Sequence, residues 1–263
     1  MTTLQPDAGS PPAHYVYGVL VAGSLPYPDC AGIDGQNVHV VAEGQVGAIV
    51  HVCGAEPYVS DDPVVLEDWV RAHNTVLETF MCEHTVLPCG FNTIIHAKED
   101  RDATAVTREW LSQEGDALAR QLEHLEGKAE YVVQVLWEPT KATEGIAASD
   151  EEIADLQSQI ASSQPGTAYM LKDKMNRLLR LKMESMATEL CAQLMAGVGA
   201  VCSDLKVEQN RKLEGGLIML ANWACLLAPD GVGRLQETLE RGVSGNDGVV
   251  IRVTGPWPAY SFV

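Results

Sequence analysis

Residues 166–196, GTAYMLKDKMNRLLRLKMESMATELCAQLMA, carry the longest regular pattern in the chain. Apolar residues recur there at steps of three and four, the spacing of one face of an α-helix, at Leu171, Met175, Leu178, Leu179, Met183, Met186, Leu190 and Leu194. Pro165 and Gly166 open the stretch, and Gly197-Val198-Gly199 follow it as a helix terminator. The pattern predicts a helix of about thirty residues and about 45 Å, long enough to extend past the sheet that it covers.

The methionines of this stripe allow two interpretations. A leucine and methionine stripe at helical spacing is usually core, whereas methionine is also the adaptable residue of promiscuous binding grooves. Met175, Met183 and Met186 are therefore candidate partner-binding residues as well as candidate core residues.

The elements around this helix predict the fold of the second half. They are a strand at 129–138, a small-residue loop at 140–149, a short helix at 151–163, the long helix, antiparallel strands at 203–210 and 213–227 around Arg211-Lys212, a helix at 230–241 and a strand at 249–255. Their main order is β-α-β-β-α-β, the split βαβ arrangement of a ferredoxin-like domain.

The first half mixes strands and helices in another order. A strand is predicted at 14–23, a hairpin at 38–53, a helix from Asp61-Asp62-Pro63 to near His84, and a strand at 91–95. A further helix is predicted to open with the acidic residues Glu99, Asp100 and Asp102 and to run to about Leu125. The fold class is α+β with two domains, the C-terminal one a modified ferredoxin-like β-α-β-β-α-β with a long helix. The expected boundaries are a disordered leader at 1–13, an N-terminal domain at 14–127 and a C-terminal domain at 128–263.

Composition excludes several classes of function. The formal net charge is −18, which disfavours nucleic-acid binding, since that requires a basic surface. No run of 18 uncharged apolar residues occurs, so neither a transmembrane helix nor a lipid-membrane partner is expected. The N-terminus lacks the basic and apolar regions of a secretory signal, and the seven cysteines form no C-x-x-C pair. These features predict a cytoplasmic protein with reduced thiols.

No catalytic motif is present: the chain lacks G-x-S-x-G, a P-loop and H-E-x-x-H. His73, Cys82, His84 and Cys89 lie close enough in sequence to consider a metal site, but they straddle a helix end and a proline turn without a second ligand pair. The sequence therefore predicts no enzyme, no cofactor and no metal.

The C-terminal residues 256–263, PWPAYSFV, contain no charged side chain. Chain ends are normally polar and frayed, so an uncharged aromatic end is either packed on the body or held for a partner. Packing is favoured, with residues 261–263 as a short edge strand. Trp257, Tyr260 and Phe262 are the aromatic candidates for partner binding.

Five stretches resemble one known family. The ending at 253–263, VTGPWPAYSFV, is similar to the VTGPWPPYSF signature that closes the gas vesicle protein F/L family. YVYG at 15–18, HNTVLETFMCEHTVLPCGFNTI from His73, GKAEY at 127–131 and GTAYML at 166–171 resemble further family motifs in the same order. Cys89 and Gly90 depart from the pattern, because the family commonly has a methionine and a basic residue there.

The resemblance implies a minor protein of gas vesicle formation with two α+β domains, the second a modified ferredoxin-like fold. It also implies a location at the gas vesicle, and as partners the small hydrophobic shell protein and other vesicle accessory proteins. Two alternatives remain open. One is a small-molecule-binding sensor or enzyme, since ferredoxin-like domains host many functions. The other is an assembly scaffold that oligomerises through exposed sheet edges.

Overall fold

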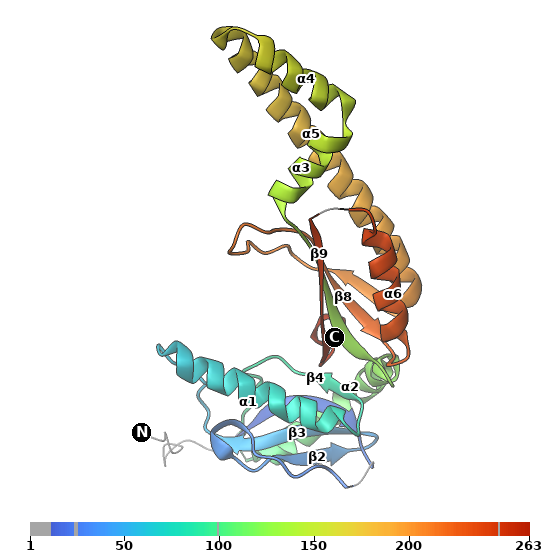
Figure 1. The fold of residues 1–263 in the computed structure, drawn as a ribbon. Coiled ribbons are helices and arrows are strands. Elements are labelled where there is room, and N and C mark those ends of the chain that lie inside the picture. The colour runs from blue at the N-terminus through green and yellow to red at the C-terminus, as the bar shows by residue number, and fades with distance from the viewer. Residues whose placement is uncertain (1–11, 24–25, 99, 247) are drawn as a thin grey trace. The chain divides into compact units, whose positions relative to one another are not determined.

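The computed structural model describes residues 12–23, 26–98, 100–246 and 248–263 as a mixed protein of helices and sheets (Figure 1). The predicted leader falls mostly on residues 1–11, which lie outside the described residues, and the first strand starts at Ala13. The chain forms two compact units. One holds the chain as far as Glu130 together with Pro256–Val263, and the other holds Tyr131–Gly255. The aromatic end, which the sequence-based boundaries placed with the second half, thus makes its contacts in the first unit.

The first unit contains an antiparallel sheet whose central strand is β1. Its strands are β1 (Ala13–Val21), β2 (His39–Glu43), β3 (Val46–Cys53), β4 (Val86–Pro88) and β5 (Ile94–Ile95). The order is β2-β3-β1-β4, and β5 also pairs with β1. β1 and β3 pair from Ala13 opposite Cys53 to Val21 opposite Val46, with a register shift between Val16 and Gly18. Because β1 has neighbours on both sides and is buried, its aromatic side chains lie inside the unit.

Two helices cover opposite faces of this sheet. They are α1 (Pro63–Met81) and α2 (Ala103–Leu125), and the side chains of Asp62 and Asp102 accept hydrogen bonds from their first turns. Successive residues of a strand point to opposite faces. Tyr15 contacts His73 of α1, whereas its neighbour His14 contacts Thr107 of α2. The first unit is therefore a helix–sheet–helix sandwich.

The second unit combines a four-stranded sheet with four helices. In chain order its elements are β6 (Ala129–Trp137), α3 (Pro139–Ser149), α4 (Glu151–Ser162), α5 (Pro165–Val201), β7 (Asp204–Val207), β8 (Ile218–Leu227), α6 (Gly231–Val243) and β9 (Val249–Trp257), and the first two residues of β6 and the last two of β9 belong to the first unit. The strand order is β7-β8-β6-β9. Leu190, Leu194 and Val198 of α5 share a core with Leu235 and Leu239 of α6 and with residues of the sheet. The antiparallel pairing predicted for the two strands before α6 is confirmed, although residues 208–217 form a longer connection than the expected turn.

The long helix extends beyond this sheet, as its length predicts. Figure 1 shows α4 running alongside the N-terminal part of α5 at a distance from the strands. Residues 140–149, expected as a loop, instead form α3, which packs on α5. Pro139 at the first helical position and the burial of Ala142 and Ile146 explain this helix. We call α3, α4 and residues 165–189 of α5 the helical arm.

The prediction that Gly197 and Gly199 end the long helix is wrong, since α5 continues to Val201. A side chain at Gly197 would place its Cβ 2.8 Å from Cγ2 of Thr238 in α6. The glycine thus allows the two helices to approach closely, and the burial of Val198 between them offsets the cost of glycine inside a helix.

The predicted edge strand at 261–263 is also wrong. β9 runs on to Trp257, and Tyr260–Phe262 then form a 3-10 turn, η2. The backbone NH of Tyr260 donates to the Pro258 carbonyl at 2.7 Å, and that of Phe262 donates to the Ala259 carbonyl at 3.0 Å. The local turn satisfies these groups without a neighbouring strand. Among the described residues, no helix is long and apolar enough to cross a membrane.

Candidate partner-binding surface and its anchoring network

Two chains of hydrogen bonds cross the core of the first unit beneath α1. In the first chain, the backbone NH of Ile33 donates to Tyr17 Oη at 2.9 Å, and Tyr17 Oη lies 2.7 Å from His51 Nδ1. His51 Nε2 lies 3.1 Å from Tyr58 Oη. Because Tyr17 already accepts from Ile33, its own proton points to His51 Nδ1. We infer that His51 carries its proton on Nε2 and donates it to Tyr58.

The second chain reaches the C-terminal end of the protein. The backbone NH of Asn92 donates to Tyr15 Oη at 3.2 Å, and Tyr15 Oη lies 2.8 Å from His73 Nδ1. His73 Nε2 lies 3.0 Å from Tyr260 Oη, which donates to Asn74 Oδ1 at 2.9 Å. The same reasoning puts the proton of His73 on Nε2, so each hydroxyl group and ring nitrogen of this second network has a partner of the right kind.

All members of these two chains are uncharged at neutral pH. Burial lowers the pKa of both His51 and His73 to about 4. Burial also raises the pKa of Tyr15 and Tyr260 well above the ordinary tyrosine value. A neutral hydrogen-bonded network whose histidines have a pKa of about 4 holds these side chains in place, and its histidines do not change protonation near pH 7. We call Tyr15, His73, Asn74 and Tyr260 the tail anchor.

A buried carboxylate holds the end of the chain a second time. The backbone NH and the hydroxyl of Ser261 donate to the two carboxylate oxygens of Glu130 at 2.8 and 2.9 Å. Glu130 is 6% exposed, and the neighbouring Phe262 is 8% exposed. Hydrogen bonds to an ionised group are the strong ones, so the last residues are fixed on the first unit.

The structure divides the three predicted tail aromatics into two kinds. Phe262 is core, whereas Trp257 is 41% exposed and Tyr260 is 37% exposed. The tail anchor fixes the hydroxyl end of Tyr260, while more than a third of this residue remains at the surface. We call Trp257 and Tyr260 the tail patch. An aromatic side chain that is held in place before binding, as Tyr260 is, loses little conformational entropy on binding, which favours its use as an anchor for a partner.

The three predicted methionines lie on the helical arm. Met175 and Met183 are half-buried, and the hydroxyl of Thr143 in α3 lies 3.4 Å from the Met183 sulfur. Met186 is exposed at 39%. The methionine stripe is thus mostly the seam between the helices of the arm.

Sequence reasoning missed several strongly exposed apolar residues on two helices. On α5 these are Tyr169, Met170 and Leu181, which are 63–77% exposed. They lie off the main apolar stripe. Their position outside the face predicted as core is the sequence feature by which they could have been recognised. On α1, Val64 is 63% exposed in the same way.

A groove of about 450 Å³ lies at one end of the first sheet, beside α2. It is lined by Val21, Gln45, Thr85, Asp116, Ala119, Arg120, Leu122, Glu123 and Glu126. Across residues 12–23, 26–98, 100–246 and 248–263, no three His, Cys, Asp or Glu side chains gather as a metal site would require. His73, one of the metal ligands considered above, has both ring nitrogens bonded to tyrosines.

Comparison with known proteins identifies the family. The family model of the gas vesicle synthesis protein GvpL/GvpF matches residues 13–263. The chain belongs to the GvpL/GvpF family. The match covers both compact units and includes the tail patch and the tail anchor.

Several gas vesicle proteins L match this chain over most of its length. It is 28% identical over 258 residues to gas vesicle protein L2 of Halobacterium salinarum, covering 94% of this chain and 90% of the relative. It is 31% identical over 239 residues to gas vesicle protein L1 of the same organism, covering 88% and 82%. Its fold resembles the crystal structure of the gas vesicle protein GvpF from Anabaena, with a TM-score of 0.72, 16% identity, and coverage of 95% and 97%. The chain is therefore a gas vesicle-related protein.

Proposed function

We propose that this GvpL/GvpF chain is an assembly accessory of the gas vesicle that binds the small hydrophobic shell protein and other vesicle accessory proteins, without enzymatic activity. It acts at the gas vesicle within the cytoplasm. The observation that carries the proposal is the tail patch, an exposed and uncharged aromatic surface in a chain with a net charge of −18.

The physical rationale concerns the state of shell subunits before assembly. Subunits of a gas-tight wall expose apolar surface while they are free, and contiguous exposed apolar surface promotes aggregation. A strongly charged accessory can bind the apolar surface of a shell subunit through its own apolar anchoring surface. Its net charge then keeps the complex apart from other complexes by electrostatic repulsion. Trp257 is the leading contact residue, because buried tryptophans dominate binding energy at interfaces.

The domain arrangement belongs to the same proposal. We regard the second unit as a modified ferredoxin-like domain, which is supported by its strand order β7-β8-β6-β9 and by the β-α-β-β-α-β succession. Its additional feature is the helical arm, inserted between β6 and β7.

The experiment is co-purification of the tagged chain with the shell protein, using wild type, Trp257→Ala and Tyr169→Ala. Tyr169→Ala is the matched control, since it removes an exposed aromatic residue elsewhere. We expect Trp257→Ala to remain folded by near-UV circular dichroism and to lose at least about tenfold in recovered shell protein. Equal recovery with wild type and Trp257→Ala contradicts the assignment of the tail patch.

A further inference from the structure

The N-terminal half of α5 is a basic segment in an acidic chain. Residues 165–182 contain five basic residues and one acidic residue, Asp173, although the whole chain has 36 acidic and 18 basic residues. Arg177 pairs with Asp173 at 2.9 Å, and Lys182 pairs with Asp150 of the arm. Among the residues that the structure describes, Lys174 has no recorded ion pair.

Two of the most exposed apolar residues lie on the same face. Met170, Lys174, Arg177 and Leu181 follow one another at steps of four, three and four, so they form one row on the helix. Met170 is 72% exposed and Leu181 is 63% exposed, at opposite ends of a row about 17 Å long. We call these four residues the arm face. It combines two apolar anchors with two positive charges.

The N-terminal part of α1 carries the opposite pattern. Asp61, Asp62, Glu67 and Asp68 lie there with a single basic residue, Arg71. Glu67 pairs with Arg71 at 2.7 Å, and this pair is about 70% exposed on both sides. The exposed apolar residues in this segment are Val64, Leu66 and Val70, at 63%, 38% and 37%.

Helical geometry places three of these residues on one side of the helix. Glu67 and Asp68 lie three and four positions after Val64, so the three side chains share one side of α1, and Arg71 lies one turn further on. Leu66 and Val70 lie on another side, because a step of two positions turns about 200° around a helix. We call Val64, Glu67 and Asp68 the α1 face. It combines an apolar anchor with two negative charges over about one turn of exposed helix.

We propose that the α1 face of one copy of this chain docks on the arm face of a second copy. Each face supplies what the other requires: exposed apolar anchors for burial and charges of opposite sign around them. Acidic copies repel one another in general, so the basic arm face is a favoured place for an acidic partner surface to approach. The proposal does not depend on the tail patch and goes beyond binding of the shell protein.

The size of the two faces determines the strength of the association. Two short helical faces bury an area at the low end of specific protein interfaces, which corresponds to a weak, concentration-dependent complex. Exposed charge pairs are screened by salt, so the complex weakens as ionic strength rises. Reciprocal docking closes a dimer, whereas one-way docking builds longer chains, and sedimentation distinguishes the two.

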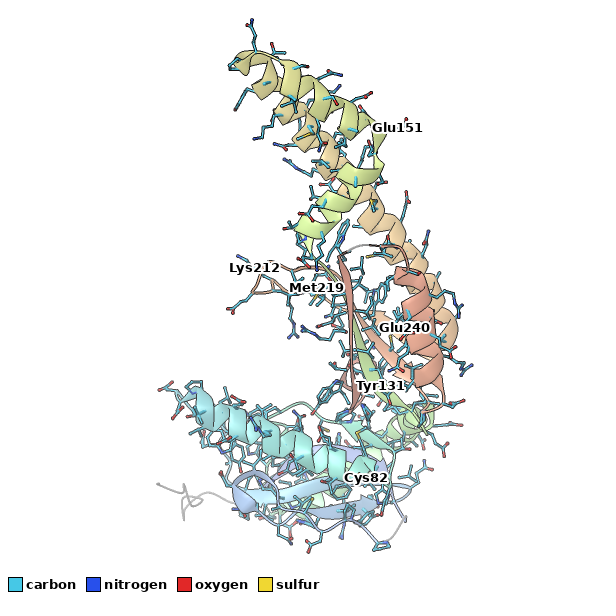
Figure 2. The ribbon with its side chains drawn as sticks, in the orientation of Figure 1. Cys82, Tyr131, Glu151, Lys212, Met219 and Glu240 are labelled. Carbon is cyan, nitrogen blue, oxygen red and sulfur yellow. The ribbon has the colours of Figure 1, made fainter. Side chains whose placement is uncertain are left out.

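The test is sedimentation velocity of the full chain from about 1 to about 200 µM, which spans the micromolar affinities at the weak end of protein interfaces, in low and moderate salt. The arm variant is Lys174→Glu with Arg177→Glu, and the α1 variant is Glu67→Lys with Asp68→Lys. The matched control is Arg211→Glu with Lys212→Glu, which makes the same charge change as the arm variant at exposed residues of the β7–β8 connection, where Figure 2 labels Lys212. We expect either face variant alone to weaken association at least about tenfold, and the control to behave as wild type.

Mixing the two variants gives the decisive result. In a 1:1 mixture, each reversed face meets a partner face of opposite sign, so we expect association to return as a mixed complex. Leu181→Ser is expected to weaken association at every salt concentration, because it removes an apolar anchor without changing charge. Three results overturn the proposal: a monomer at all concentrations, association that is unchanged in the face variants, or a mixture that stays monomeric.

Discussion

Lowering the pH from 7 to 5 is expected to destabilise the first unit through His51 and His73. Both residues are buried and neutral in the folded protein, where their pKa is about 4. In the unfolded chain the pKa of histidine is about 6.5. Between these values the unfolded chain binds more protons than the folded one. The stabilisation is therefore fully present above about pH 6.5 and is lost as the pH falls toward about 4.

The magnitude follows from the two pKa values. At pH 5 each histidine contributes about 2 kcal/mol less to the free energy of unfolding than at pH 7. The pair therefore lowers the free energy of unfolding by roughly 4 kcal/mol. His14, whose pKa is also lowered mainly by burial, adds to the same trend. The assay is urea-induced unfolding followed by circular dichroism at a series of pH values.

A variant separates these histidines from the many carboxylates of the chain. His73→Gln keeps an NH group that can donate to Tyr260 and removes the titrating ring, so its free energy of unfolding should fall by about 2 kcal/mol less than that of the wild type between pH 7 and pH 5. His96→Gln, at an exposed histidine, is the control and should keep the full pH dependence. The reasoning is refuted if the free energy of unfolding is the same at pH 5 and pH 7, or if His73→Gln retains the full dependence.

Three further substitutions test the packing. Gly18→Ala should destabilise the first unit by about 2 kcal/mol or more, because its Cβ would lie 2.7 Å from the Leu87 carbonyl oxygen. Gly90→Ala is the control and should be nearly neutral, because there is open space around Gly90. Both are measured by urea-induced unfolding. Trp223→Ala should cost about 3–5 kcal/mol, measured in the same way, since it empties the centre of the second core. Glu130→Gln should lower the free energy of unfolding by about 2 kcal/mol and increase amide hydrogen exchange of the last residues, while unchanged exchange would contradict its role in holding them.

The sequence predicted features that depend on local patterns. The apolar spacing of residues 166–196 was sufficient to predict a long helix that passes beyond its sheet, and alternating strands with turn residues were sufficient for the hairpin of β2 and β3. The end of α5 and the helix α3 were missed. In both cases, close packing against another helix decided the outcome, and a local pattern does not contain that information.

The candidate surface was predicted in part for the same reason. The uncharged composition of the C-terminal residues pointed to Trp257 and Tyr260, and the structure leaves both at the surface. The tail anchor was not predicted, because His73 and Tyr260 are 187 residues apart and neither stands in a motif of polar residues. Long-range hydrogen bonds between single residues become visible only when the fold brings them together.

The measurement that tests the central claim most directly is the amount of shell protein that remains unaggregated when it is co-expressed with this chain. The comparison is with shell protein alone and with shell protein beside Trp257→Ala. We expect the shell protein to co-elute with the wild-type chain and to be lost to aggregates in the other two cases. Shell protein that aggregates equally in all three cases would contradict direct binding by this GvpL/GvpF chain.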